Sequence, residues 1–530
     1  MTSIRKEYSY GGTLIVALLC VSLLRVLYIL YGPLDLSPDE TLYWDCTRRL
    51  DLSYYSKGPL IVYLMYVSTA LFGSNAFAIR VMAVVFYFLS SLVLYKLVLS
   101  LYDSRPLSLE DKPYYSDVRF IALVCVLLFQ IIPLFATYAI VFTIDSPFVF
   151  FWILSLYLFW KALNTSEGHS DWILLGISIG LGMQAKYIMA MFIACAFAFM
   201  LLTQYRPVLK TIKPYAAFIV SMAVFSPVII WNMRHDWVTL KHTAGHAHLS
   251  DGLKIAPMSL LEFLGSQLGV VTPVLFVLIC IALFKLRGDG LKKQGFFLLC
   301  FSVPIFSFFL FKSVQGKVQA NWPMTGYITG VIAFVRYFFY AERKESLKLT
   351  GKHTKRAVII GILIAILVVT AGLYPSLLGI PPQVDPASRL RGWKVLGDEV
   401  GRLYGGLAGK GDVLIFSDKY QITSELAFYV KGNPITYCIN LGRRMNEYDI
   451  WPNLNEAADH IRQNKSSHKQ INAIFITDGN GSLPQPVGAA FDRCDKQLFE
   501  VYENQIVLRM YSIFTCLDFK RIQDETPQTY

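Results

Sequence analysis

Long apolar runs separated by short polar stretches make up the first 380 residues of the chain. A run of about 20 apolar residues is long enough to cross a bilayer as a helix. The pattern predicts a polytopic α-helical membrane protein with about 11 to 13 spans. Lys186 separates two short runs and predicts a break at the membrane surface. The predicted spans lie near residues 11–31, 77–101, 118–137, 147–163, 172–185, 187–203, 214–231, 259–284, 295–311, 323–340 and 357–378.

After residue 380 the sequence becomes polar, and short strand-like runs alternate with helical patterns. Such alternation predicts a small α/β domain with a largely parallel sheet. We therefore divide the chain into a transmembrane domain at 1–380, whose first loop at 32–76 carries interfacial helices, and an α/β domain at 381–530. The strand-like runs are Val413–Phe416, Ile435–Cys438, Ile471–Ile476 and Ile506–Tyr511, and the helical patterns are Tyr420–Val430 and Leu454–Ile461.

Composition points to the same class of protein. Hydrophobic residues make up 55% of the chain and charged residues 16%, whereas soluble domains carry about 25% charged residues. The mean hydropathy is +0.46. A net charge of +12 would suit a nucleic-acid-binding protein, but the basic residues cluster in short loops between apolar runs. That distribution follows the positive-inside rule, so no nucleic-acid partner is predicted.

The same bias predicts the orientation. Loops rich in Lys and Arg are predicted to be cytoplasmic together with the N-terminus. The first loop, the hairpin around Asp145 and the domain after residue 380 are predicted to face outward. The basic loops contain Arg5, Lys6, Arg105, Lys112, Arg119, Lys161, Arg206, Lys210, Lys213, Lys285, Arg287, Lys292, Lys293, Arg343, Lys344, Lys348, Lys352, Lys355 and Arg356.

The nine cysteines form no CxxC pair and no zinc spacing. Three of them, Cys438, Cys494 and Cys516, lie in the α/β domain and could form one disulfide. The first apolar run lacks a small-residue cleavage site and is expected to stay as a membrane anchor.

The segment Ser37-Pro38-Asp39-Glu40 follows the first apolar run. A capping box explains Ser37 as N-cap, Pro38 as N1 and Glu40 as N3. It does not require Asp39, although an acid at N2 favours the helix dipole. Acids near hydrocarbon are costly and usually functional, so a structural and a functional interpretation both stand.

Lys57 precedes Gly58-Pro59, where a second, interfacial helix is predicted to begin. A cation near a helix N-terminus opposes the dipole. An anion bound there would reconcile the two, because amides and ammonium would share it. The alternative is a lysine that snorkels to water.

Other polar residues lie at the predicted ends of spans. Asp145 is an isolated acid that is explained either as a helix cap or as a second acid of a site. Arg234, His235 and Asp236 lie between Trp231 and Trp237, which are expected anchors at the membrane interface. Lys317 follows Gly316 before a late span. His242, His246 and His248 match no standard zinc motif.

Together these residues suit transfer from a lipid phosphate. Cations stabilise the charge that develops on a departing phosphate, and a carboxylate can take the proton of an incoming hydroxyl. An apolar surrounding would hold the lipid tail and exclude water that would hydrolyse the donor.

At these positions the chain resembles the GT-C superfamily of membrane glycosyltransferases. The branch is similar to bacterial relatives of protein O-mannosyltransferases and of the lipid A aminoarabinose transferase. The matching stretches are Pro38-Asp39-Glu40 with Tyr43-Trp44, Leu50–Tyr55 with Pro59-Leu60, Thr143-x-Asp145-x-Pro147 with Phe151-Trp152, Ala185-Lys186-Tyr187, Ser226-Pro227 through Trp231-Asn232 to His235-Asp236-Trp237, Ser417–Gln421 and Asn440–Arg444.

The resemblance implies a GT-C fold in a bacterial inner membrane and transfer of a sugar from a polyprenyl-phosphate donor to a lipid or protein acceptor. It implies that Asp39, Glu40 and Asp145 are catalytic and that Tyr43, Tyr55 and His235 contact substrate. Lys57, Lys186, Arg234 and Lys317 would bind the donor phosphate. Many relatives carry His or Pro where this chain has Lys57-Gly58, so the donor contact there transfers less directly.

Two alternatives stand beside this hypothesis. A transporter or flippase would bury paired charges in mid-span, whereas the polar residues here gather at span ends; a membrane-anchored binding protein would show no turnover. No organic cofactor is predicted. Paired carboxylates can hold a divalent metal ion, so a metal at Asp39 and Asp145 remains open.

Overall fold

The computed structural model describes residues 10–102, 118–165, 169–246, 256–286, 293–339, 352–375, 381, 385–464, 470–503 and 505–523. The chain divides into two compact units. The helical unit comprises Met1–Leu30, Arg80–Ile230 and His246–Ala371, and the mixed unit comprises Tyr31–Ile79, Trp231–Gly245 and Gly372–Tyr530.

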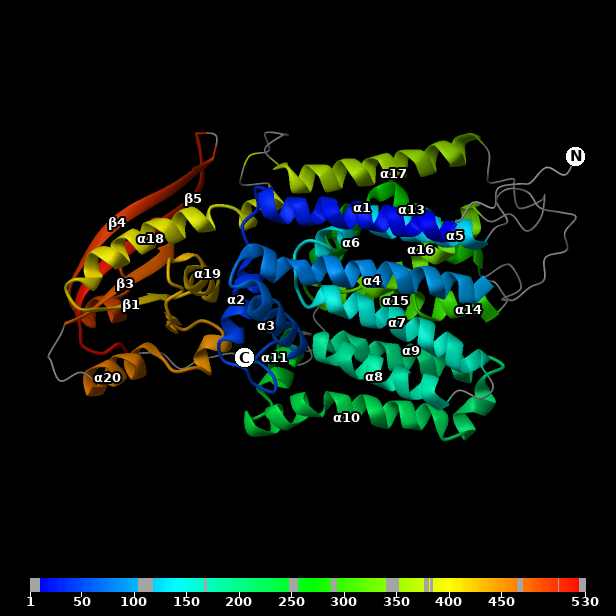
Figure 1. Ribbon diagram of the computed structural model, residues 1–530, viewed down its shortest axis with the longest axis horizontal. Helices are drawn as coiled ribbons and strands as arrows, with labels where there is room; N and C mark the ends of the chain where they lie inside the picture. Colours follow the sequence, from blue (N-terminus) through cyan, green and yellow to red (C-terminus); the bar gives the residue numbers. More distant parts are fainter. Residues whose placement is uncertain are drawn as a thin grey trace, which may run out of the picture. The chain divides into compact units, whose positions relative to one another are not determined.

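The long helices of the helical unit run roughly parallel to one another (Figure 1). Every predicted span contains one helix or a pair of helices separated by a short break. The helices are α1 (Tyr10–Tyr31), α4 (Ala76–Tyr102), α5 (Val118–Ile131), α6 (Pro133–Tyr138), α7 (Asp145–Asn164), α8 (His169–Ala185), η2 (Tyr187–Met189), α9 (Ala190–Leu201), η3 (Arg206–Lys210), α10 (Lys213–Arg234), α12 (Pro257–Val271), α13 (Pro273–Leu286), α14 (Lys293–Cys300), α15 (Val303–Gln315), α16 (Met324–Phe339) and α17 (Lys352–Leu373).

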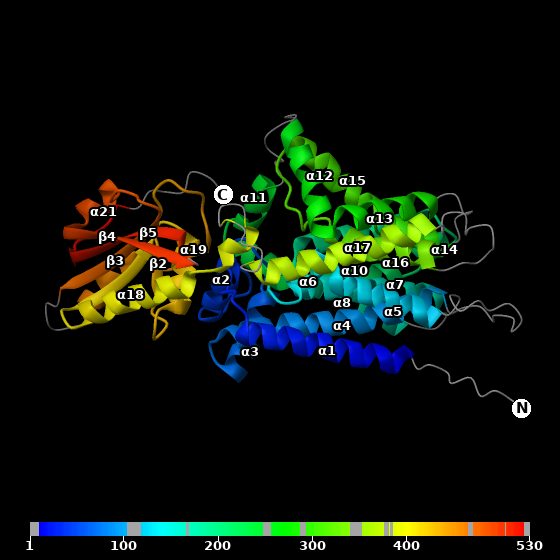
Figure 2. The same cartoon turned by 90° about the horizontal axis from the view of Figure 1, so that it is seen from above.

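Among the described residues, six helical segments are long and apolar enough to cross a membrane by themselves. A seventh is obtained if α12 and α13, which are bent by 100°, count as one broken span (Figure 2). Shorter apolar helices such as α5 and α16 accompany them. The chain is therefore a multi-pass membrane protein, and the predicted number of spans stays a prediction.

The predicted break at Lys186 is confirmed. Helix α8 ends at Ala185, Lys186 is extended with φ of −151°, and η2 begins at Tyr187. The side chain of Lys186 nevertheless lies inside the protein, since only 8% of it is exposed.

Glycines allow α8 to approach α10 closely. A Cβ added at Gly176 would lie 2.5 Å from the carbonyl oxygen of Ala217, and one at Gly180 would lie 2.6 Å from the Cβ of Val224. Small residues four apart permit such contacts between membrane helices. The α7–α8 hairpin, which holds Asp145, thus packs on a neighbour that leaves no room for larger side chains at these positions.

The mixed unit is built on a five-stranded sheet in the order β2-β1-β3-β5-β4. Pairing is parallel between β1 and β2 and between β1 and β3, but antiparallel between β3 and β5 and between β5 and β4. The prediction of a largely parallel sheet is therefore wrong for half of the ladders. The strands are β1 (Asp412–Ser417), β2 (Thr436–Cys438), β3 (Ile471–Asp478), β4 (Phe491–Glu503) and β5 (Ile506–Phe519).

Helices cover both faces of this sheet (Figure 1). Helices α18 (Trp393–Ala408) and α19 (Tyr420–Tyr429) pack on one face, and α20 (Leu454–Asn464) and α21 (Gln485–Ala489) pack on the other. The four predicted strands and the two predicted helices are confirmed. The sequence did not predict strand β4. Its residues, FDRCDKQLFEVYE, include many charged side chains and form no apolar run, because β4 lies at the edge of the sheet.

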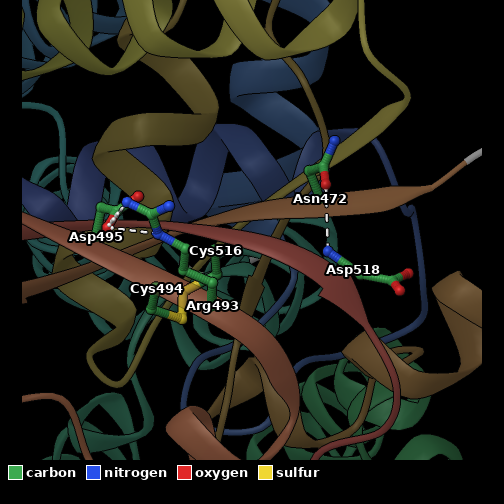
Figure 3. Close-up of a disulfide and its surroundings, with 6 residues drawn as sticks. All are labelled: Asn472, Arg493, Cys494, Asp495, Cys516 and Asp518. Atoms are coloured by element: carbon green, nitrogen blue, oxygen red, sulfur yellow. Dashed lines mark hydrogen bonds and ion pairs between the residues drawn. A yellow bond between two sulfur atoms is a disulfide. The ribbon is translucent and has the colours of Figure 1, made fainter.

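A disulfide joins Cys494 of β4 to Cys516 of β5, which are direct partners in the antiparallel register (Figure 3). Cys438 is a buried free thiol. Near this bridge the amide of Asp518, a residue with φ of 59°, donates to Oδ1 of Asn472 at 3.3 Å (Figure 3). The sequence left the pairing open, and the register of the hairpin settles it.

The first loop packs on the α/β domain within the mixed unit. It contains α2 (Pro38–Thr47) and α3 (Leu60–Phe72), and α11 (Val238–His246) joins them. The amide of Asp35 donates to the carbonyl of Leu390 at 2.7 Å, and Thr41 Oγ1 contacts Ser424 Oγ at 3.0 Å. The compact unit therefore extends beyond the predicted range 381–530.

Several basic loop residues that support the predicted orientation, among them Arg5, Lys6, Arg105 and Lys112, lie outside the described residues, as does His248. The orientation of the chain in the membrane therefore stays a prediction.

Candidate functional site

The capping box at the start of α2 is confirmed. Oγ of Ser37 accepts the amide N–H of Glu40 at 3.3 Å, and Oε2 of Glu40 accepts the amide N–H of Ser37 at 2.8 Å. Glu40 is fully buried. Its carboxylate therefore serves the cap, and a catalytic role for Glu40 stays a prediction that this geometry does not favour.

Asp39 points elsewhere, because successive helical residues lie about 100° apart around the axis. Asp39 is half-buried and lines a cleft. The hydroxyl of Tyr420 donates to its carboxylate, and the negative charge of Asp39 is the main cause that raises the pKa of Tyr420 above its usual value, with the charge of Arg444 opposing it. Asp39 is thus an accessible carboxylate with a hydroxyl partner that orients it.

The cleft lined by Asp39 has a volume of about 620 Å³. It lies entirely within the mixed unit, between the N-terminus of α2, the 3-10 helix η6 (Pro386–Leu390), the starts of α18 and α19, and strands β3 and β5. Its lining residues are Ser37, Pro38, Asp39, Arg389, Leu390, Trp393, Lys419, Tyr420, Gln421, Ile422, Asp478, Arg509 and Tyr511.

Lys57 lies three residues before α3, as predicted. It is half-buried, and among the described residues its ammonium has no hydrogen bond or ion pair. Arg234 is exposed in the last turn of α10, where a cation suits the helix dipole. Neither residue lines the cleft that Asp39 lines. Their predicted contact with a phosphate stays a prediction.

The predicted substrate residues Tyr43 and Tyr55 are buried, with 2% and 1% exposure. The amide of Tyr55 donates to Oε2 of Glu447 at 2.7 Å, and its hydroxyl lies 3.2 Å from Nδ1 of His242. His235 stacks on Trp231 at 4.0 Å, and its Nδ1 donates to the carbonyl of Trp231. The burial of Tyr43 and Tyr55 indicates that both side chains pack in the interior. His235 is half-exposed, and its predicted contact with substrate stays a prediction.

Glu447 is a buried carboxylate that joins the α/β domain to the first loop. Burial raises its pKa to about 8, against the opposing effect of the Tyr55 N–H. Burial also raises the pKa of Asp45, which accepts a hydrogen bond from the hydroxyl of Tyr448 at 2.8 Å. Glu447 therefore holds a proton in the folded state at neutral pH, and it would release this proton on unfolding.

This linkage predicts how stability depends on pH. The folded pKa of Glu447 lies above its unfolded value, so its contribution is complete below about pH 4.5 and is lost as pH rises through about 8. Above that range the loss of stability is roughly 5 kcal/mol. We expect thermal unfolding in detergent to occur at lower temperature at pH 9 than at pH 6. In Glu447→Gln, which keeps an acceptor for Tyr55, this difference should shrink.

Glu456→Gln is the matched control, because Glu456 is exposed at the start of α20, whereas Glu447 is buried. An unchanged pH dependence in Glu447→Gln would contradict the assignment.

Asp145 and Lys186 form a buried ion pair in the helical unit. Nζ of Lys186 lies 2.6 Å from Oδ1 of Asp145, and the two side chains are 8% and 5% exposed. Nδ2 of Asn321 donates to Oδ2 of Asp145 at 2.9 Å. Asp145 makes no capping hydrogen bond to its helix, so the cap interpretation is wrong. Asn321 was missed, because its partner lies 176 residues away.

This pair changes the interpretation of Lys186. Its ammonium is engaged by a carboxylate and lies 5.6 Å from the ring centre of Phe148. The geometry of Lys186 therefore favours a structural ion pair over the predicted contact with a phosphate. Lys317 is exposed in the segment before α16. Its predicted phosphate contact stays a prediction.

A metal held by Asp39 and Asp145 together stays a prediction. Across the ranges that the structure describes, no group of three or more His, Cys, Asp or Glu side chains is arranged to hold a metal ion. The two acids belong to different compact units.

The chain is similar in sequence to known glycosyltransferases. Residues 56–109 and 112–231 match the dolichyl-phosphate-mannose-protein mannosyltransferase family. The lipid A galacturonosyltransferase of Rhizobium johnstonii is 28% identical over 345 residues, which cover 64% of this chain and 68% of that protein. The undecaprenyl phosphate-alpha-4-amino-4-deoxy-L-arabinose arabinosyl transferase of Erwinia tasmaniensis is 31% identical over 193 residues, which cover 33% and 32% of the two chains.

Solved structures share the fold over most of the chain. ArnT from Cupriavidus metallidurans, in complex with undecaprenyl phosphate, aligns with a TM-score of 0.62 at 12% identity and covers 96% of this chain and 98% of its own. The oligosaccharyltransferase of Archaeoglobus fulgidus aligns with a TM-score of 0.52 at 14% identity, covering 90% of this chain and 70% of its own.

These relatives favour an enzyme over a transporter. The family match, the related glycosyltransferase sequences and the shared fold agree with the helical bundle. The chain therefore resembles membrane glycosyltransferases in sequence over part of its length, and it shares the fold of ArnT over most of it.

Proposed function

We propose that the protein transfers a sugar from a polyprenyl-phosphate donor to a lipid or protein acceptor at the outer face of a bacterial inner membrane. The observation that carries this proposal is Asp39, an accessible carboxylate held by Tyr420 at a cleft with cationic side chains. Relatives named for lipid A and for undecaprenyl phosphate support a lipid acceptor and a prenyl donor. The sugar is a hexosyl or pentosyl residue, the classes that these relatives transfer.

The reaction we propose is a single displacement with inversion. A bond forms between the acceptor oxygen and the anomeric carbon, while the bond from that carbon to the phosphate oxygen breaks. Asp39 takes the proton of the acceptor hydroxyl, and polyprenyl phosphate leaves with the bonding electrons. Lys57 and Arg234 stabilise the charge on the leaving phosphate. Tyr420 orients Asp39.

The same proposal places the mixed unit outside the cytoplasm, with the N-terminus inside. The disulfide between Cys494 and Cys516 supports this placement, because disulfides persist in oxidising compartments and are rare in the cytosol. The sparse basic residues of the first loop support it as well.

The test uses the full-length protein in liposomes. It is supplied with undecaprenyl-phosphate-linked aminoarabinose or galacturonic acid as donor and with lipid A as acceptor, and products are followed by mass spectrometry. Donor-dependent addition of the sugar to lipid A is expected. Movement of the donor across the bilayer without any transfer would overturn the proposal.

Lys57→Gln tests the donor contact. Losing a charge-assisted hydrogen bond to phosphate should raise the KM for the donor by about tenfold or more, with a smaller rise in Lys57→Arg. The control is Lys394→Gln, because Lys394 is exposed on α18. If Lys57 only extends its ammonium toward water, Lys57→Gln should leave the KM for the donor unchanged, and the proposed donor contact would be wrong.

A further inference from the structure

We propose that the cleft lined by Asp39 is the acceptor site and that it binds a sugar ring carrying an anionic group, a phosphate or a carboxylate. The inference rests on the proposed function, because it names the substrate that Asp39 would deprotonate. Four features of the lining carry it: the fixed Arg509, the exposed Arg389, two carboxylates and the ring of Tyr420.

Arg509 is held in a fixed orientation. Its guanidinium lies 4.1 Å from the ring centre of Trp393. One terminal nitrogen donates to the hydroxyl of Tyr511 at 3.2 Å, and the other donates to the carbonyl of Ser388 at 3.1 Å. A planar guanidinium that is already ordered loses little entropy when an anion binds. This arginine is therefore suited to recognition of a phosphate or carboxylate.

Arg389 adds a second cation on the same cleft. Its side chain is exposed, and it makes no hydrogen bond or ion pair with another residue in the described ranges. Lys419 is paired only loosely with Asp478, at 3.5 Å with 47% and 57% of the side chains exposed. Exposed pairs of this kind contribute little to stability, so their polar atoms remain accessible to a ligand.

The remaining lining suits the sugar itself. Asp39 and Asp478 provide oxygen acceptors for ring hydroxyls, and the half-buried ring of Tyr420 provides aromatic surface. A volume of about 620 Å³ falls in the range of small-molecule sites. Three cations against two carboxylates give the lining a net charge of 3 − 2 = +1, which favours an anionic ligand.

Asp39 connects this site to the reaction. A sugar ring held in the cleft would bring a hydroxyl beside the carboxylate that is proposed to take its proton. Acceptor recognition and deprotonation would then occur in one cleft that needs both the first loop and the α/β domain.

The first test measures binding to the full-length protein in nanodiscs by calorimetry. Glucosamine 6-phosphate is the probe, with glucosamine and inorganic phosphate as separate arms. We expect the sugar phosphate to bind at least tenfold more tightly than either fragment. Arg389→Glu should weaken it by about ten- to a hundredfold. Arg402→Glu is the control, since Arg402 is exposed on α18 outside the cleft.

Absence of binding at millimolar probe, or equal weakening by Arg389→Glu and Arg402→Glu, would overturn the site. Phosphate binding as tightly as the sugar phosphate would also overturn it, because the cleft would then be an anion site without sugar recognition.

The second test measures transfer. Arg389→Glu should raise the KM for the acceptor and leave the KM for the donor unchanged. A rise in the donor KM instead would overturn the acceptor assignment while leaving the glycosyltransferase intact. If the wild-type protein transfers no sugar but binds the probe through Arg389, the proposed function fails and the site stands.

Discussion

Asp39→Asn is expected to lower the rate of sugar transfer by about 10²- to 10⁴-fold, the usual worth of a general base. The amide keeps the shape and the hydrogen bond with Tyr420 but cannot accept a proton. The fold should change little, because Asp39 contributes to the cap of α2 only through the helix dipole, worth less than about 1 kcal/mol. Initial rates with saturating donor and acceptor measure the effect, and thermal unfolding checks the fold.

Glu40→Gln is the matched control, one residue away. A glutamine at the third helical position still completes a capping box with Ser37. We expect wild-type rates within about twofold and an unchanged unfolding temperature. If Glu40→Gln lost activity as severely as Asp39→Asn, the assignment of Glu40 to the cap would be wrong. If Asp39→Asn retained wild-type rates, a base role for Asp39 would be excluded.

The capping box also explains why two neighbouring acids take different roles. The cap requires that Glu40 turn back toward the amide of Ser37, which places its carboxylate in the protein interior. Asp39, one position earlier, then faces the cleft. One local hydrogen-bonding motif thus buries one carboxylate and presents the other.

Local patterns in the sequence predicted local structure well. The apolar runs matched the helices, and Gly58-Pro59 marked the start of α3. The short apolar runs after residue 380 located β1, β2, β3 and β5. These features depend on residues near one another in the chain. Strand β4 lacked such a signal because an edge strand can carry charges on its exposed face.

Contacts between distant residues could not be predicted. Tyr420 reaches Asp39 only because α19 packs on α2. Its motif, Ser417–Gln421, was noticed as a family feature, but no spacing rule connects positions 39 and 420. The sequence predicts Lys186 and Asp145, 41 residues apart, as members of a site, but only the fold shows that the two charges neutralise each other.

The Asp145–Lys186 pair leads to the second large effect that we expect. Asp145→Asn would leave a lysine ammonium buried without its carboxylate, and breaking a buried pair in this way costs about 3–5 kcal/mol. Lys186→Met would leave the Asp145 carboxylate with only the amide of Asn321 and the weak contact of Thr143 at 3.4 Å. Both single variants should unfold at markedly lower temperature in detergent.

The double variant Asp145→Asn with Lys186→Met distinguishes the pair from its parts. It removes both charges, and replacing a buried pair by neutral groups is often close to neutral in stability. We therefore expect it to recover most of the unfolding temperature lost by either single variant. A simple sum of the two single losses would contradict direct coupling.

Lys520→Met supplies the control, because it removes an ion pair whose two side chains are both exposed. Lys520 pairs with Asp492 at 2.6 Å, with 62% and 53% of the side chains exposed, so the unfolding temperature should change little. The comparison also decides between the two roles considered for Lys186. If Lys186 bound the donor phosphate, Lys186→Met would raise the donor KM and leave the unfolding temperature unchanged. If Lys186 instead positions Asp145 and, through Asn321, the segment that leads into α16, Lys186→Met should lower the unfolding temperature. The double variant should then restore that temperature, because no unpaired charge would remain buried.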